Sequence, residues 1–133
     1  MMELGADIHK ASNDGETPVH WAACNGHAEV VTLLVVGGPD INKANNSGET
    51  PLYRAAWSGH AEVAKLLVAG KADINKADND GETPLWRAAR EGHAEVVKLL
   101  LSHGADKTKA TENGRTPLDV AGNEEIKQML QGE

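Results

Sequence analysis

The chain has almost no aromatic residues and a single cysteine. Its 133 residues contain no Phe, three Trp and one Tyr, although hydrophobic residues make up 40%. Packing must therefore rest on Ala, Leu and Val, which suits thin, closely spaced helices. Because Cys24 is the only cysteine, an intrachain disulfide and a cysteine-based zinc site are excluded. A lone cysteine agrees with a reducing compartment, so we expect an intracellular, cytoplasmic protein.

Long apolar runs and an excess of basic residues are also missing. The run from Leu33 to Val36 is far shorter than the roughly 20 residues of a membrane span, and no signal-peptide pattern opens the chain. Thirteen Lys and Arg stand against 20 Asp and Glu, a net charge of −7. This balance argues against general binding to phosphate backbones. We therefore expect neither a membrane nor a nucleic acid as partner.

The sequence does contain a motif that repeats at a fixed interval. The dipeptide Thr-Pro recurs every 33 residues, beginning at Thr17, Thr50, Thr83 and Thr116. A fixed period of this size indicates one supersecondary unit that is copied and stacked. We predict a single domain over residues 1–133. Its predicted parts are the tail of a partial unit (1–11), three units (12–44, 45–77 and 78–110) and a shortened C-terminal capping unit (111–133).

Residues 78–110 form the clearest unit. Asn79-Asp80-Gly81 is typical of a tight turn. Thr83-Pro84 is typical of a helix start, where the threonine hydroxyl caps the first turn and proline loses no hydrogen bond. Gly92 suits a helix end, and a second helix is expected from residue 93 or 94 to 102. Since neither helix is long enough to be stable alone, we predict an all-α solenoid of helix-turn-helix units joined by β-hairpin-like loops.

Three places depart from the period. Residues 1–11 match only the end of a unit, so the first complete unit has a poorly covered face; this predicts a trimmed fragment or weak self-association through the N-terminal face. Lys71 stands where other units have Gly38 and Gly104, and a left-handed backbone there would cost roughly 1 kcal/mol. The last unit is shortened between its helices, and its polar second helix suits a solvated cap.

The repeated motif resembles that of the ankyrin repeat family. It reads Gly15-Glu16-Thr17-Pro18-Val19-His20-Trp21-Ala22-Ala23, then Gly26-His27-Ala28-Glu29-Val30-Val31, and recurs over residues 48–63 and 81–96. The resemblance implies a stack with hairpin fingers on one side, inner helices lining a concave face and outer helices behind. It also implies a non-catalytic scaffold for protein recognition. Because the second and third units are closely alike, both a natural segment and an engineered product of one remain open.

Residues that could carry catalytic chemistry lack the patterns that such chemistry needs. His27, His60 and His93 occupy one repeat position, so stacking separates them by roughly 10 Å, too far for a shared zinc ion. We expect them to fix the turn between the two helices by hydrogen bonding. Cys24 belongs to no recognisable nucleophile signature, and Gly37-Gly38-Pro39 is not a phosphate loop. We expect no enzyme, no cofactor and no metal.

The candidate binding residues lie in two columns of the first helices that the family leaves free. The columns read Trp21, Arg54, Arg87, Val120 and Cys24, Trp57, Arg90. Because residues three apart on a helix are neighbours, Arg54 is expected beside Trp57, and Arg87 beside Arg90, along one wall. Trp and Arg are enriched at interface hot spots. The alternative is that the tryptophans pack between units and the arginines form surface ion pairs.

A third column contains His20, Tyr53, Trp86 and Asp119. The resemblance implies that His20 bonds to the Thr-Pro turn, and the large side chains at this position either pack near the helix start or form a recognition ladder. By the same resemblance, Asn42 and Asn75 lie where ankyrin domains can be asparagine-hydroxylated; the alternative is that they stabilise their loops.

The loop tips form an edge that is acidic except at its C-terminal end, with Glu49, Asp80 and Glu82 as candidate contacts. Such an edge would complement a basic ridge on a partner and would set the encounter rate more than the affinity. We therefore expect a protein or peptide partner that contacts the concave face and the loop tips. The alternative function is an engineered or structural repeat array with no dedicated partner.

Overall fold

The structure is a computed structural model that describes residues 15–37 and 40–131. The predicted partial unit over residues 1–11, and the loop residues Gly38 and Pro39, lie outside these ranges. The described residues form eight α-helices and no strand. The helices are α1 (Pro18–Asn25), α2 (Ala28–Gly37), α3 (Pro51–Ser58), α4 (Ala61–Ala69), α5 (Pro84–Glu91), α6 (Ala94–Ser102), α7 (Pro117–Val120) and α8 (Glu124–Gln131).

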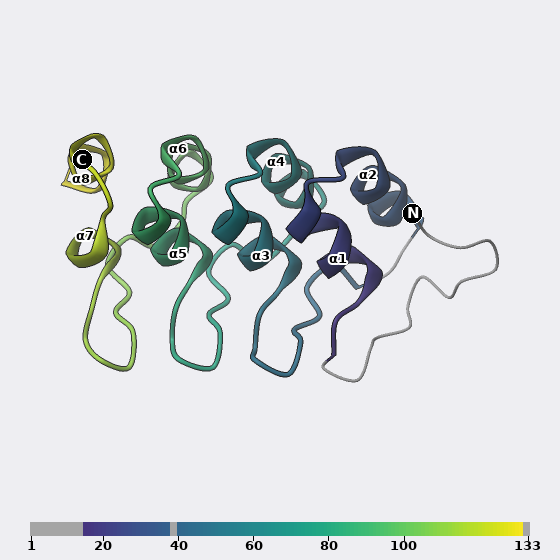
Figure 1. Ribbon diagram of the computed structural model, residues 1–133, viewed down its shortest axis with the longest axis horizontal. Coiled ribbons are helices and arrows are strands. Elements are labelled where there is room, and N and C mark those ends of the chain that lie inside the picture. Colours follow the sequence, from purple (N-terminus) through teal and green to yellow (C-terminus); the bar gives the residue numbers. More distant parts are fainter. Residues whose placement is uncertain (1–14, 38–39, 132–133) are drawn as a thin grey trace.

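The helices form two layers. Figure 1 shows α1, α3, α5 and α7 in an inner row, α2, α4, α6 and α8 in an outer row, and long loops that project from the inner row on the side away from the outer one. Contacts join each inner helix to the outer helix of its own unit and to the inner helix of the next unit. The predicted all-α solenoid of helix-turn-helix units is therefore confirmed.

Each inner helix begins and ends as its sequence predicts. The hydroxyls of the four Thr-Pro threonines accept hydrogen bonds from the backbone N–H three residues later, and proline follows at the first helical position. The first three inner helices end at glycines in the left-handed conformation, with φ of 72° at Gly26, 81° at Gly59 and 82° at Gly92. Only glycine adopts this conformation without steric cost.

Small and branched aliphatic residues fill the space between the layers. Paired alanines on the inner helices are fully buried and let neighbouring helices approach closely: Ala22 and Ala23, Ala55 and Ala56, Ala88 and Ala89. Valine and leucine on the outer helices complete one continuous core. The expectation that Ala, Leu and Val do the packing is confirmed.

The loops between units are hairpin-like and bonded to one another. The N–H of Asp78 donates to the carbonyl of Glu82 over 2.9 Å across the base of one loop, while Asp78 Oδ1 accepts the N–H groups of Asp80 and Glu82 inside it. Successive loops are joined by Asn79 N–H to Ser47 O at 3.0 Å and by Glu112 N–H to Asp80 O at 3.1 Å. The loops therefore form a row with a shared backbone hydrogen-bond pattern.

The two departures from the period that the structure describes behave as predicted. Lys71 adopts a left-handed backbone with φ of 74°. In the last unit, α7 has only four residues, and the N–H of Gly122 donates directly to Ala89 O of the preceding unit over 2.8 Å. Ile126 and Leu130 are buried while the polar residues of α8 face outward, so this helix caps the stack.

Candidate functional site

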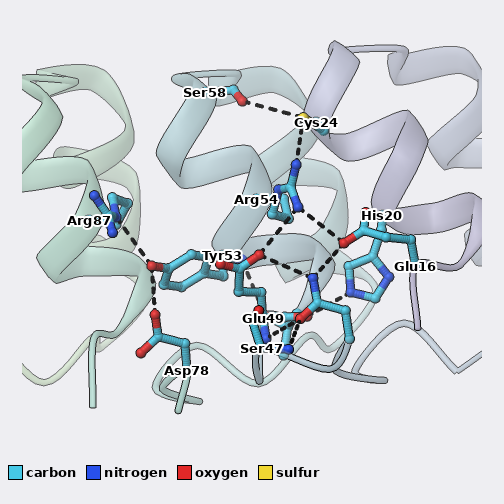
Figure 2. Close-up of polar contacts among 12 residues, drawn as sticks. Glu16, His20, Cys24, Ser47, Glu49, Tyr53, Arg54, Ser58, Asp78 and Arg87 are labelled. Carbon is cyan, nitrogen blue, oxygen red and sulfur yellow. Dashed lines mark hydrogen bonds and ion pairs between the residues drawn. The ribbon is translucent and has the colours of Figure 1, made fainter. Parts of the chain in front are cut away.

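The candidate residues lie on the surface formed by the inner helices α1, α3, α5 and α7 and the loop that precedes each of them. We call this surface the inner wall. Figure 2 shows its polar contacts over the first three units, where side chains of one unit reach toward the next.

The column of His20, Tyr53 and Trp86 is buried. His20 and Tyr53 have no exposed surface, and Trp86 is 6% exposed. As the resemblance implied, His20 bonds to the Thr-Pro turn: Thr17 N–H donates to Nδ1 over 3.0 Å. Of the two alternatives for this column, the burial of all three side chains favours packing at the helix start.

Tyr53 links two units. Its hydroxyl lies 2.8 Å from Asp78 Oδ2 and 3.0 Å from Glu82 Oε1, both on the next loop, and accepts a hydrogen bond from Arg87 Nε over 3.2 Å. Burial is the main cause that raises the pKa of Tyr53 far above its usual range. The hydroxyl therefore stays protonated and holds the second and third units together.

Arg54 also bridges units. Its Nη1 lies 3.1 Å from Glu16 Oε2 on the preceding loop and 3.2 Å from Glu49 Oε1 on its own loop. Its Nη2 lies 3.2 Å from the sulfur of Cys24. Figure 2 shows this guanidinium between the thiol on one side and the two carboxylates on the other. Most of the hydrogen-bonding capacity of Arg54 is thus used inside the stack.

Arg87 is the most enclosed cation of the inner wall, 9% exposed. It pairs with Glu82 at 2.7 Å and with Glu91 at 3.1 Å. Its guanidinium carbon lies 4.1 Å from the centre of the Trp57 ring, a cation–π contact between two units. The alternative that the arginines are ion-paired within the fold describes Arg54 and Arg87 well.

Three of the candidate residues on the inner helices are exposed. Trp57 is 39% exposed and Trp21 42%, and the Arg90 side chain is 54% exposed, with one long contact to Glu91 at 3.3 Å. Trp21 stacks on the His27 ring at 4.8 Å, and Trp57 meets Tyr53 edge-on at 5.9 Å. Each tryptophan therefore has one supported face and one face open to solvent.

The acidic loop residues divide into two kinds. Glu49 and Glu82 turn toward Arg54 and Arg87, which leaves their side chains only 13% and 17% exposed. Asp80 remains exposed at the loop tip. The acidic edge expected from the sequence is therefore weaker than a count of carboxylates indicates, because two of them neutralise inner-wall arginines.

The repeated histidines hydrogen-bond at the turn between the two helices, as expected: the N–H groups of His27, His60 and His93 donate to Ala22 O, Ala55 O and Ala88 O over 2.9 to 3.0 Å. The rings of the second and third add a contact that was not expected. His60 Nε2 lies 3.1 Å from the carbonyl of Cys24, and His93 Nε2 lies 2.9 Å from the carbonyl of Trp57. Each of these two rings thus bonds to the inner helix of the preceding unit, while the backbone N–H of the same residue closes its own turn. The sequence does not reveal these ring contacts. Because the units repeat, an equivalent carbonyl occurs in the histidine's own unit and in the preceding one, and the sequence does not show which of them the ring contacts.

Asn42 and Asn75 stabilise the loops. The side-chain oxygen of Asn42 accepts the N–H of Asp73 over 2.7 Å, and that of Asn75 accepts the N–H of Asp106 over 2.9 Å. Both bonds join one unit to the next.

The last interface contains a pocket that the sequence reasoning did not anticipate. It has a volume of about 600 Å³ and lies between α5 and the last loop, lined by Trp86, Arg87, Arg90, Thr111, Arg115 and Val120, with Asp80, Glu82, Glu112 and Asn113 also contributing. The signal that could have found it is the change from arginine to valine at position 120 in an otherwise repeated column.

Other classes of site find little support in the part of the chain that the structure describes. Within residues 15–37 and 40–131, no three His, Cys, Asp or Glu side chains are grouped so that they could hold a metal ion. No helix in these ranges has the length and apolarity to cross a membrane.

A family model described as Ankyrin repeats (3 copies) matches residues 1–78 and, in a second match, residues 69–132. Together the two matches span all four Thr-Pro motifs. No curated protein matches the chain.

Proposed function

The chain belongs to the ankyrin repeat family, whose repeats generally mediate protein–protein interaction, and from this premise we propose that it is a non-catalytic scaffold that binds a protein or peptide partner through the inner wall and the loop tips. The proposed units are residues 12–44, 45–77, 78–110 and 111–133, each with one inner helix and one loop. We also propose an intracellular location, which the single cysteine supports.

One observation carries the proposal. Trp57 is exposed at the centre of the inner wall although the fold already holds its other face against Arg87 and Tyr53. A large aromatic ring that is both rigid and partly open offers contact area at low entropic cost, as hot-spot residues do. Arg90, on the next unit, adds an exposed guanidinium. Trp21 extends the same surface toward the first unit.

The buried candidates support the exposed ones. Tyr53 and Arg87 contact the Trp57 ring and hold it in place. Arg54 with Glu49, and Arg87 with Glu82, form contacts between the inner helices and the loops, and Arg87 also lies over the ring of Trp86. Asp80 at the loop tip provides an exposed charge for a second point of contact. The proposed partner therefore meets Trp21, Trp57, Arg90 and Asp80 directly.

The test is an affinity pull-down from cell lysate with Arg90→Glu and Trp57→Phe variants beside the parent protein. Trp57→Phe keeps a ring against Arg87, whereas Trp57→Ala would remove the support for this cation. Lys98→Glu on α6, exposed on the outer layer, is the control with the same change of charge. A partner that the parent and Lys98→Glu retain, and that Arg90→Glu loses, supports the proposal; equal retention by every variant contradicts it.

A second candidate is a structural repeat array, natural or engineered, with no dedicated partner. The internal pairing of Arg54 and Arg87 favours it, because these arginines stabilise the stack without a ligand. The absence of any reproducible partner in the same pull-down, with variants that fold and melt like the parent, would favour this candidate.

The N-terminal face is proposed to self-associate weakly. Leu33 on α2 is 72% exposed and Val36 82%, whereas Leu66 and Leu99, at the equivalent position of later units, are half-buried in the core. Exposed apolar surface of this kind favours association. Sedimentation velocity across a range of concentrations should show a dimer that Leu33→Gln removes; a monomer mass independent of concentration would refute it.

A further inference from the structure

The last interface between units differs from the two before it in the charges that it brings together. At the first, Arg54 of the inner helix reaches Glu16 and Glu49 on the loops. At the second, Arg87 reaches Glu82. In the last unit the helix position holds Val120 and the loop position holds Arg115. The guanidinium has moved from the helix to the loop, where no carboxylate of the described residues forms an ion pair with it, although Asp80, Glu82 and Glu112 line the same interface.

The shorter side chain of Val120 leaves space where the earlier units have an arginine. This is the pocket of about 600 Å³. Arg87 and Arg90 lie on one side, with their guanidinium carbons 5.4 Å and 6.0 Å from the centre of the Trp86 ring. Arg115 contributes from the facing loop, where its side chain is exposed. The pocket is therefore bounded by cations from two units.

Two residues that line the pocket, Trp86 and Arg115, have side-chain donors without an acceptor among the described residues. Trp86 is 6% exposed, and its indole Nε1 is buried with no hydrogen-bond partner among the described residues. Unsatisfied buried donors are rare in folded proteins and call for an explanation. Arg115 makes no ion pair within residues 15–37 and 40–131. Its neighbour Asp119 accepts the N–H of Thr116 over 2.8 Å, and the pKa of Asp119 is lowered mainly by its hydrogen bonds to Thr116 and also by the charge of Arg115. Arg90 has only its long contact with Glu91.

We propose that this pocket binds the carboxylate of an aspartate or glutamate side chain on a partner protein, with Arg115 and Arg90 as the groups that pair with it. The inference rests on the proposed scaffold function and specifies the chemistry of one contact. A bound carboxylate would reproduce at the last interface the pairing that Glu49 makes with Arg54 at the first. Charge-assisted bonds of this type are stronger than neutral ones.

Other ligand charges fit less well. A cationic side chain could pair with Asp80 or Glu112 in the lining, since Glu82 already pairs with Arg87 at 2.7 Å. It would also face Arg90 and Arg115, and it has no acceptor to offer the indole N–H of Trp86, which has no partner among the described residues. A phosphate carries nearly two negative charges and would meet Asp80, Glu82 and Glu112, which also line the pocket. A single carboxylate accepts hydrogen bonds from the same donors but carries about half the charge of a phosphate. Its repulsion from Asp80, Glu82 and Glu112 is correspondingly smaller.

The test selects binders from a displayed library of random dodecapeptides and measures their affinity for the parent, Arg115→Glu, Arg115→Gln and Lys98→Glu. Arg115 is exposed, so its variants should fold, and circular dichroism and thermal melting check this. We expect selected peptides to share an Asp or Glu, to bind Arg115→Glu about tenfold more weakly or worse, and to bind Lys98→Glu as they bind the parent. Replacing the shared acid by Lys should restore binding to Arg115→Glu.

A second readout reports on the pocket itself. In a ¹H–¹⁵N spectrum, the Trp86 indole N–H, assigned with Trp86→Phe, should shift on addition of a selected acidic peptide and stay in place with the version in which Gln replaces the acid. Peptides that lack a shared acid, ignore Arg115→Glu and still lose binding in Trp57→Phe or Arg90→Glu would overturn the carboxylate pocket and leave the scaffold function standing. Selections that yield no peptide dependent on Trp57, Arg90 or Arg115 would overturn both.

Discussion

At the scale of single residues, the protonation of His20 follows from its neighbours. Thr17 N–H donates to Nδ1, which must therefore be unprotonated, and Nε2 lies 2.7 Å from the carbonyl of Glu49, to which it donates. The ring is thus held in its neutral form between two units. Burial lowers the pKa of His20 below its ordinary value of 6.5, although the bond to Glu49 and the charge of Glu16 oppose this shift.

Because the pKa of His20 is lowered in the folded protein, the free energy of unfolding decreases as the pH is lowered. Below about pH 6.5 the imidazole of His20 binds a proton in the unfolded chain but not in the folded one. The contribution of His20 to the free energy of unfolding is therefore fully present above this pH and is lost as the pH falls toward the pKa of the folded state. Urea unfolding at pH 7 and at about pH 5.5 should show the decrease in the parent protein and a smaller one in His20→Gln. An identical decrease in both proteins would assign it to other groups.

Lys71 illustrates a cost of local backbone strain. Its φ of 74° is one that glycine adopts freely and lysine does not. We expect Lys71→Gly to raise the free energy of unfolding by about 1 kcal/mol. Lys76→Gly, in the same exposed loop but without a positive φ, should give no gain. Chemical denaturation of the three proteins measures both effects, and equal stabilities of the two variants would count against this explanation.

At the scale of the structural element, two of the glycines between paired helices, Gly26 and Gly59, lie so close to a histidine of the next unit that a side chain there would collide with it. A Cβ placed on Gly59 would lie 2.6 Å from His93 Nδ1, whereas a Cβ on Gly104 would meet nothing within 4 Å. Both glycines have a positive φ, 81° and 89°. The pair therefore separates backbone strain, which they share, from the contact between units, which only Gly59 makes.

We expect Gly59→Ala to destabilise the protein by about 1 to 3 kcal/mol more than Gly104→Ala, because His93 must move and lose its bond to Trp57 O. Thermal and urea unfolding measure the difference. When His93 is already replaced by Ala, the additional cost of Gly59→Ala should fall and approach the cost of Gly104→Ala. The double variant Gly59→Ala/His93→Ala, compared with His93→Ala alone, measures this additional cost. If Gly59→Ala and Gly104→Ala cost the same, the contact has no energetic weight.

Much of each element could be predicted from the sequence, because its determinants are local. Thr83, Pro84 and Gly92 are the N-cap, the first residue and the C-cap of α5, and they fix its ends. The contacts of the site could not be predicted in the same way. Arg54 meets Glu16 across 38 positions, and Trp57 meets Arg87 of the next unit, through the stacking geometry alone. The periodic columns place the candidate residues on the inner helices but do not separate buried Tyr53 and Arg87 from exposed Trp57 and Arg90.

At the scale of the whole molecule, stability is expected to be a sum of terms between neighbouring units, because each unit packs against the next. Ile126 on α8 is fully buried at one end of the stack and Leu67 on α4 in its middle. We expect Ile126→Ala to cost about 2 to 4 kcal/mol and to speed amide hydrogen exchange in α7 and α8 while α1 and α2 keep their protection. Leu67→Ala should speed exchange on both sides. Uniform acceleration by Ile126→Ala would contradict additive stacking.

The loop row described above also has a mechanical consequence. The bonds from Asn79 to Ser47 and from Glu112 to Asp80 join successive loops in series, as the helix contacts join successive units. Tension applied between the two ends therefore loads one junction after another instead of a single shared core. We expect such a chain to lengthen in steps, with the four-residue α7 marking the junction that yields first. Each detached unit of 33 residues would release roughly 110 Å of contour length.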